Sequence, residues 1–282
     1  MNAYPIGKIA TWLKAPILTH LEGESEVCEL LYDSRRMDHP EGSLFIALVT
    51  SRNNGHRFIE GLIKQGVKQF LVQETPREEL LNEARFIVVP DTLKALQLIT
   101  RVHRLQFQLP LIGITGSNGK TIVKEWLYET LKDDFKIVRS PKSFNSQIGV
   151  PLSVWSIQEK DELAIIEAGI SAPGEMSALR AIVQPTLGIF TNIGNAHAEN
   201  FSSRQQHIEE KMCLFDGSEL LICCSDYPEI TEAAKAHFIP TLCWGKTEAA
   251  QLRVLNEKRS AGKTSIDLLW EENRFQLNVP FS

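Results

Sequence analysis

The stretch GITGSNGKT, residues 113 to 121, places three glycines, a lysine and a threonine directly after the apolar run LPLI. Backbone N–H groups bind phosphate only where the chain wraps closely around it, and glycine permits both the close approach and the positive φ angles required. The lysine would then act as a point charge toward the phosphates, and the threonine would be a Mg²⁺ ligand. We therefore expect a nucleotide-binding loop made of Gly116, Ser117, Asn118, Gly119, Lys120 and Thr121.

The spacing of these glycines departs from the standard phosphate-loop motif, whose first glycine would fall at Ile114. A glycine-rich turn that binds no ligand is the alternative. The GKT ending follows a predicted strand and opens a predicted helix, and this context favours phosphate binding.

Four further residues follow or face the predicted strand ends, where doubly wound sheets bind their ligands. Glu167 ends the strand ELAIIE, and it meets either a cation or solvent there. His197 follows a strand end in TNIGNAH, either as a ligand or as an ordinary loop histidine. Lys211 lies on the helix HIEEKMCLF, where a lysine taken alone would be solvated. Asn145, in KSFNSQIG, either caps the following short helix or donates to a phosphate.

These residues are positioned by alternating strand and helix patterns, which predict an α/β protein of two domains. QFQLP at 106–110 is typical of a crossing, so we expect an N-terminal domain at 1–108 and a central domain at 109–282. The central domain begins with the strand LIGIT and a helix over 120–131, and strands and helices then alternate as far as TLCW. The helix over 120–131 should place on one face Val123, Trp126, Leu127, Thr130 and Leu131.

The apolar, β-rich character of the strands in the central domain predicts a mostly parallel sheet with helices on both faces. From residue 251 the pattern changes to QLRVLNEK, TSIDLLW and RFQLNVP, joined by turn-like segments. This alternation predicts an antiparallel extension of the sheet.

Composition excludes several classes of protein. A net charge of −5 and a pI near 5.9 argue against nucleic-acid binding through a basic field. The longest apolar runs, such as LLICC, fall far short of the roughly 20 residues that span a bilayer, so we expect no membrane insertion. The five cysteines form no CxxC pair and the start lacks a signal peptide, so we expect a cytoplasmic protein with reduced thiols.

Together these motifs resemble the Mur ligase family along essentially the whole chain. TGSNGKT resembles the family's ATP loop, IIEAG its metal-binding glutamate strand, TNIGNAH its asparagine and histidine segment, and EEKMCLF the site of its carboxylated lysine. YDSRRM, GSLFIAL and NNGHRFIEGLIKQG are similar to the family's UDP-substrate domain. FNSQIGVPLSVW resembles the stretch found in the dipeptide-adding members.

The resemblance implies that ATP phosphorylates the terminal carboxylate of UDP-MurNAc-tripeptide, and that the amine of D-Ala-D-Ala attacks the acyl phosphate. It implies a first Mg²⁺ on Thr121 and Glu167, and a second Mg²⁺ on His197 and a carboxylated Lys211, with Lys120 on the phosphates. For the UDP substrate it suggests Ser34 and Arg35 from the N-terminal domain, with Asn145 and Ser146 from the central domain. Arg35 could equally be a surface salt-bridge partner.

Two alternatives stay open: another amide ligase of this kind, such as the tripeptide-forming member or a folylpolyglutamate synthase, and a nucleotide- or UDP-sugar-binding module without chemistry. The family's later GRHNxxN stretch and third domain do not occur before Ser282. We therefore expect a fragment with little or no ligase activity alone. A fusion to an alanine racemase, known among bacterial relatives, stays open.

Overall fold

Contacts divide the chain into two units, and the computed structural model describes residues 2–35, 39–50, 53–194 and 198–280. The first unit comprises Met1–Gln108 and Gln147–Lys160, and the second comprises Leu109–Ser146 and Asp161–Ser282. The chain first changes unit within the QFQLP segment. Residues 147–160, which we expected in the central domain, group with the first unit instead. Trp155 explains this difference, because it lies in the hydrophobic core of the first unit.

The first unit is built on a five-stranded sheet. Its strands, in spatial order, are β2 (Ile17–Leu18), β9 (Arg85–Val88), β8 (Gln69–Val72), β5 (Ser43–Ile46) and β4 (Glu29–Leu31). Neighbours pair in parallel except β2 and β9. Two short antiparallel pairs are β1 (Tyr4–Pro5) with β3 (Glu26–Val27) and β6 (Val49–Thr50) with β7 (Asn53–Asn54). The helices are α1 (Ile6–Leu13), α2 (Ile59–Lys64), α3 (Thr92–Arg104) and α5 (Gly149–Trp155).

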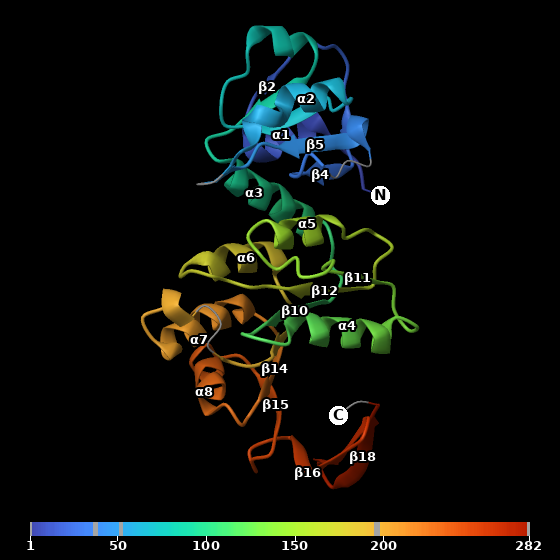
Figure 1. Ribbon diagram of the computed structural model, residues 1–282, viewed down its shortest axis with the longest axis vertical. Helices are drawn as coiled ribbons and strands as arrows, with labels where there is room; N and C mark the ends of the chain where they lie inside the picture. The colour runs from blue at the N-terminus through green and yellow to red at the C-terminus, as the bar shows by residue number, and fades with distance from the viewer. Residues whose placement is uncertain (1, 36–38, 51–52, 195–197, 281–282) are drawn as a thin grey trace. The chain divides into compact units, whose positions relative to one another are not determined.

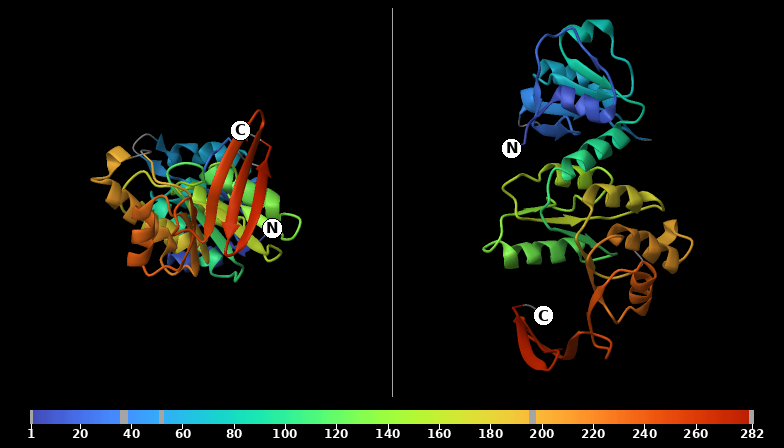
Figure 2. Two further views of the ribbon diagram at one scale, coloured as in Figure 1. Left: turned by 90° about the horizontal axis from the view of Figure 1, so that it is seen from below. Right: turned by 180° about the vertical axis from the view of Figure 1, so that it is seen from behind.

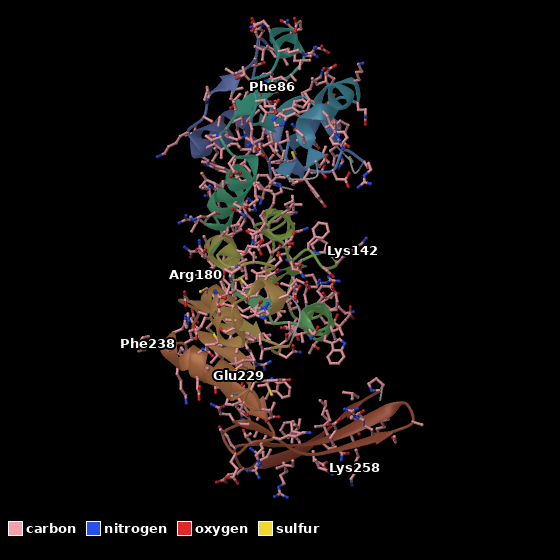
Figure 3. The ribbon with its side chains drawn as sticks, turned by 60° about the vertical axis from the view of Figure 1, so that its left-hand side comes forward. Phe86, Lys142, Arg180, Glu229, Phe238 and Lys258 are labelled. Atoms are coloured by element: carbon pink, nitrogen blue, oxygen red, sulfur yellow. The ribbon has the colours of Figure 1, made fainter. Side chains whose placement is uncertain are left out.

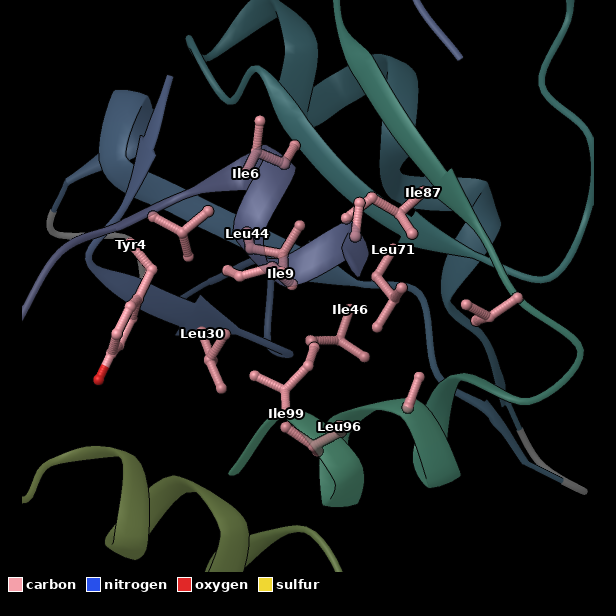
Figure 4. Packing of buried hydrophobic residues seen from close by; sticks show 14 of the residues in the cluster. Tyr4, Ile6, Ile9, Leu30, Leu44, Ile46, Leu71, Ile87, Leu96 and Ile99 are labelled. Atoms are coloured by element: carbon pink, nitrogen blue, oxygen red, sulfur yellow. The ribbon is translucent and has the colours of Figure 1, made fainter. Parts of the chain in front are cut away.

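Both faces of this sheet are covered by apolar side chains. Successive residues of a strand point to opposite faces, so β5 supplies Leu44 and Ile46 to one core and Phe45 to the other. Figure 4 shows the first core, where Ile46 lies near Leu96 and Ile99 of α3, and Leu44 lies beside Ile9 of α1. The strand patterns of the first hundred residues therefore reflect burial on both sides.

The second unit contains a nine-stranded sheet. In spatial order its strands are β11 (Ile137–Arg139), β12 (Leu163–Glu167), β10 (Leu111–Thr115), β13 (Leu187–Phe190), β14 (Leu220–Cys224), β15 (Thr241–Gly245), β16 (Leu252–Ser260), β17 (Lys263–Trp270) and β18 (Asn273–Val279). Neighbours from β11 to β16 pair in parallel, and β16, β17 and β18 pair antiparallel. Figure 2 shows the last three strands side by side in red. The predicted parallel sheet and antiparallel extension are confirmed.

The helices of the second unit are α4 (Lys120–Leu131), α6 (Glu175–Val183), α7 (Arg204–Met212) and α8 (Pro228–Ala236). Helix α4 lies on one side of β10 and β12, and α6 lies on the other (Figure 1). Val123 and Leu127 of α4 pack against Ile114 of β10, as the periodicity predicts. Trp126, expected on the same face, is 52% exposed, and the buried residue of α4 is Lys124. No helix in the described ranges is long and apolar enough to span a membrane.

The connections change direction at β10, which lies between β12 and β13. After β10 the chain crosses to the edge strand β11, and after β12 it crosses to β13 on the opposite side of β10. Doubly wound sheets bind ligands beyond the carboxyl ends of the strands at such a point. Because the glycine-rich loop directly follows β10, the topology places it there.

Gly188→Ala is expected to lower the free energy of unfolding by about 1–3 kcal/mol, because it adds an atom to a packed core. An added Cβ would lie 2.5 Å from Cδ1 of Phe215 and 2.9 Å from Cδ1 of Leu221. Urea unfolding followed by circular dichroism measures the change. Gly61→Ala is the control, since a Cβ at this helical position meets no atom within 4 Å. Equal unfolding midpoints for the two variants would contradict the close packing at β13.

Candidate functional site

The glycine-rich loop links β10 to α4 in a conformation that requires glycine. Gly116 has a φ of +138°, and a Cβ at this position would lie 2.1 Å from Oγ1 of Thr191. Gly119, directly before α4, has a φ of +81°. Residues with a side chain rarely adopt such positive φ angles. At Gly116 the close approach of Thr191 also leaves no space for a side chain.

The loop and the start of α4 present groups suited to an anion. The N-cap residue Gly119 has no side chain, so the first N–H groups of α4 are left for water or a ligand. The Nζ of Lys120 folds back over the loop and donates to the carbonyl O of Gly116 at 2.8 Å. Burial lowers the pKa of Lys120, whereas the negative charge of Glu167 raises it. A phosphate at this point would add counter-charge to a partly buried ammonium.

The segment after β13 holds the loop in place. The backbone N–H of Ser117 donates to the carbonyl O of Asn192 at 2.9 Å, and that of Asn118 donates to Oδ1 of Asn192 at 3.1 Å. The hydroxyl of Thr191 donates to the carbonyl O of Asn118 at 2.6 Å. Sequence reasoning selected this segment for its histidine and missed Thr191 and Asn192. The sequence feature that could have identified them is the presence of two polar residues directly after an apolar strand.

Glu167 lies at the end of β12 with a fully buried side chain. Its Oε2 accepts a hydrogen bond from the hydroxyl of Thr121 at 2.9 Å, and its Oε1 accepts one from Nδ2 of Asn145 at 2.6 Å. The Nζ of Lys124 lies 3.6 Å from Oε2. The carboxylate thus meets two hydrogen-bond donors and a cation, rather than solvent.

Asn145 and Lys124 complete this cluster. Asn145, which we expected to contact the UDP substrate, binds Glu167 and accepts the N–H of Gly169 on its carbonyl O at 2.7 Å. Ser146 follows it on the exposed side of the same loop. Lys124 was not selected at all. The sequence feature that could have identified Lys124 is its position four residues after Lys120, which places both lysines on the same side of the helix.

Lys211 of α7 is 2% exposed, in contrast to the solvated position expected for a helix lysine taken alone. Burial, together with the positive charge of Lys120, lowers the pKa of Lys211 to about 8. Lys120 and Lys211 therefore interact from two different helices. A region with one buried and one partly buried cation favours an anion, because a negative charge compensates for the lost hydration.

Helix α7 is tied to α8 by ionic contacts. The Nδ1 of His237 lies 2.6 Å from Oδ1 of Asp216, and its Nε2 lies 2.9 Å from Oε2 of Glu209 on α7. Arg204 of α7 bonds Glu229 of α8, which is labelled in Figure 3, at 2.8 and 2.6 Å. Burial alone would lower the pKa of His237, but the hydrogen bonds and charges of the two carboxylates outweigh it and raise the pKa. These contacts fix the helix that bears the buried lysine.

The oxygen atoms of Thr121 and Glu167 fit the requirements of Mg²⁺. This ion prefers oxygen ligands and is usually bound by one or two carboxylates together with waters and substrate phosphates. Within the described residues, no three histidine, cysteine, aspartate or glutamate side chains gather into a metal-binding group. A site completed by phosphate oxygens is consistent with this donor set. His197, the other expected ligand, lies outside the described residues.

The first unit has an open pocket of about 450 Å³ at the predicted UDP contacts. The residues that line it are Tyr32, Asp33, Ser34, Arg35, Asn53, Arg57 and Phe58. Arg35 donates to Asp33 from Nε at 2.9 Å and from a terminal nitrogen at 2.8 Å, and its side chain is 86% exposed. Arg35 thus forms an exposed salt bridge with Asp33, and its contact with the UDP substrate stays a prediction. The guanidinium of Arg57 lies 4.7 Å from the centre of the Phe58 ring.

Comparisons with known proteins identify the family and the fold. The family model for the Mur ligase middle domain matches residues 114–282. The sequence is 31% identical over 231 residues to the UDP-N-acetylmuramoyl-tripeptide–D-alanyl-D-alanine ligase of Bacillus subtilis, covering 81% of this chain and 50% of the relative. The chain thus spans half the length of that relative.

Two solved structures share the fold. A crystal structure of MurF from Acinetobacter baumannii matches with a TM-score of 0.88 at 24% identity, covering 100% of this chain and 62% of the other. MurF ligase from Thermotoga maritima in complex with ADP matches with a TM-score of 0.80 at 24% identity, covering 90% and 58%. At this identity the likeness shows the fold, which includes the doubly wound sheet around β10.

Raising the pH is expected to weaken the attachment of α7 to α8. The folded-state pKa of His237 is raised, so its contribution is complete below the unfolded pKa of about 6.5 and is lost as the pH rises through the folded value. His237→Gln should therefore destabilise most near pH 6 and progressively less toward about pH 9. Urea unfolding across this range measures the difference. Arg204→Gln is the control, because it breaks the neighbouring ion pair without a group that titrates there. A constant effect of His237→Gln would contradict the assignment.

Proposed function

The chain belongs to the Mur ligase family, and we propose that it takes part in the ATP-dependent joining of D-alanyl-D-alanine to UDP-N-acetylmuramoyl-tripeptide, the substrates in its relatives' names. ATP would phosphorylate the terminal carboxylate of the tripeptide. The amine of D-alanyl-D-alanine would then attack the acyl phosphate, forming the amide and releasing phosphate. The proposal is carried by one contact: the Thr121 hydroxyl meets the buried Glu167 carboxylate directly beyond the glycine-rich loop.

The reaction needs positive charge, because it brings a carboxylate against a triphosphate. Two unit charges about 4 Å apart repel by about 4 kcal/mol at an effective dielectric of 20. Lys120 supplies one cation, and the first turn of α4 supplies N–H donors. Thr121 and Glu167 would hold Mg²⁺, which when bound neutralises phosphate charge and aligns the transfer.

The remaining assignments are part of the same proposal. His197 and a carboxylated Lys211 would hold a second Mg²⁺, since carboxylation turns the lysine into an anion with two oxygens. Ser34 and Arg35 would contact the UDP substrate in the N-terminal domain at 1–108. For Arg35 this requires its guanidinium to leave or share Asp33. Asn145 and Ser146 would meet the substrate from the central domain at 109–282.

FNSQIGVPL favours the dipeptide-adding reaction over a tripeptide-forming ligase or a folylpolyglutamate synthase. A module that only binds nucleotide is disfavoured by the second buried lysine. Binding of nucleotide alone requires the glycine-rich loop and Lys120, but it does not require Lys211 on a different helix.

Ligand binding is the direct test, because the chain spans half the relative's length. By isothermal titration calorimetry the chain should bind ADP more tightly with Mg²⁺ than with EDTA, and should bind UDP-MurNAc-tripeptide in preference to UDP-MurNAc-dipeptide. Preference for the dipeptide would favour a tripeptide-forming ligase. Binding of ADP without either UDP substrate would favour the nucleotide-binding module.

Gly116→Ala provides the loss-of-binding arm of this test. Backbone strain of about 1–3 kcal/mol and the clash with Thr191 should weaken ADP binding by about tenfold or more. Gly217→Ala is the matched control, because Gly217 also has a positive φ (+87°) but an added Cβ there would meet no atom within 4 Å. Equal loss of ADP binding in both variants would argue against the loop as the nucleotide site.

Carboxylation of Lys211 is expected to give a carbamate signal in carbon-13 NMR when the chain is supplied with labelled bicarbonate. Only the neutral amine reacts with CO₂, and a pKa of about 8 leaves about half of this amine neutral at pH 8. The signal should therefore fall as the pH is lowered from 8 to 6. It should vanish in Lys211→Gln and persist in Lys132→Gln, which alters an exposed lysine paired with Glu129. Persistence in Lys211→Gln would refute the assignment.

A further inference from the structure

We infer that Lys124 is a positioning residue of the nucleotide site: its ammonium holds Glu167 and two carbonyl groups of the loop after β11, and keeps these contacts when Mg²⁺ and nucleotide are bound. This inference rests on the proposed function, because it takes Glu167 as a Mg²⁺ ligand. It adds a residue that neither binds the nucleotide nor reacts. Lys124 acts through the groups that it orients.

The ammonium of Lys124 lies close to four acceptor oxygens, two from carbonyls and two from carboxylates. The residue is fully buried, and its Nζ donates to the carbonyl O of Ser140 at 2.7 Å and to that of Lys142. The same atom lies 3.1 Å from Oε1 of Glu125 and 3.6 Å from Oε2 of Glu167. An ammonium has three N–H donors. The two carbonyls and Glu125 accept them, and Glu167 interacts with the ammonium by charge at 3.6 Å. A buried lysine with this many acceptors is held in one place.

These contacts join α4 to the loop that covers Glu167. Ser140 and Lys142 follow β11, and three residues later the same loop supplies Asn145, which donates to Oε1 of Glu167 at 2.6 Å. Lys142, labelled in Figure 3, has a φ of +50° and an exposed side chain, while its carbonyl O accepts from Lys124. Lys124 therefore fixes the backbone on one side of Glu167, and Asn145 fixes the carboxylate on the other.

The charges around Lys124 indicate a permanent support rather than a substitute for the metal. Glu125 is bound by Lys124 and also by Nε of Arg139 at 3.0 Å. Two cations, Lys124 and Arg139, thus balance two carboxylates, Glu125 and Glu167. Lys124 has three partners other than Glu167. These contacts can hold its ammonium in place when Mg²⁺ binds to Glu167. Residues that orient a metal ligand from behind are often as important as the ligand, and their loss typically weakens metal binding about 10- to 100-fold.

The experiment measures ADP affinity of the chain with Mg²⁺ and with EDTA, and takes the ratio as the gain due to the metal. Lys124→Met removes the charge at similar length, Lys124→Arg keeps the charge, and Lys132→Met is the control on an exposed lysine at the end of the same helix. Lys124→Met is expected to cut the gain about 10- to 100-fold while leaving ADP affinity in EDTA unchanged. Lys124→Arg should restore part of the gain, and Lys132→Met should keep all of it.

Each other outcome overturns the inference. An unchanged gain in Lys124→Met would show that Glu167 needs no such support, and equal loss with and without Mg²⁺ would show a purely structural role. Absence of any gain in the wild-type chain would overturn the metal assignment itself, which separates failure of the proposed function from failure of this inference.

If Lys124→Met fails to fold, lysine accessibility in the wild-type chain tests the inference instead. Amine-selective acetylation followed by mass spectrometry reports which lysines are accessible. Lys124 should stay unlabelled both alone and with Mg²⁺ and ADP, whereas exposed Lys132 is labelled in both states. Labelling of Lys124 on addition of Mg²⁺ and ADP would show that the metal displaces it, and would overturn the inference.

Discussion

The buried carboxylate of Glu167 is the group on which the arrangement of the second unit's site depends. Removing an ion from water costs several kcal/mol unless other groups replace the lost hydration. Thr121 and Lys124 from α4 and Asn145 from the loop after β11 provide that replacement. Three segments distant in sequence are thereby held at one point. Neither the start of α4 nor the loop can shift without leaving the carboxylate uncompensated.

A second constraint is steric, and it fixes the position of the glycine-rich loop between β10 and α4. Gly116 lies so close to Thr191 that no side chain fits between β10 and the segment after β13. Asn192 then accepts from one loop N–H through its backbone and from the next through its side chain. The glycine-rich loop is thus held by Thr191 and Asn192 after β13, and the start of α4 is held by Glu167 of β12 through Thr121. These two sets of contacts hold the loop at the carboxyl end of β10, the strand at which the connections change direction.

The sequence predicted best the elements that have a regular local pattern of apolar residues. The strand before the glycine loop, the helix after it and the antiparallel strands from β16 to β18 follow from apolar periodicity, and the structure contains all of them. Lys124 escaped prediction because lysines are almost never fully buried unless paired, and its partners come from segments that only the fold brings near. Residues 147–160 were misplaced for a similar reason. Their position depends on Trp155, whose ring NH donates to the carbonyl O of Cys28 in the first unit.

The electrostatics divide the site into two parts of different character. The charges of Lys124 and Arg139 balance those of Glu125 and Glu167, so the carboxylate lies in a nearly neutral cluster that can accept a metal together with its phosphates. Around Lys120 and the uncarboxylated Lys211 two cations repel each other, and burial together with this repulsion lowers the pKa of Lys211. Anionic groups are stabilised most beside Lys120 and Lys211, and a hydrated cation is stabilised most beside Glu167. A ligand that brings both a metal and phosphates therefore satisfies the two parts at once, which neither component does alone.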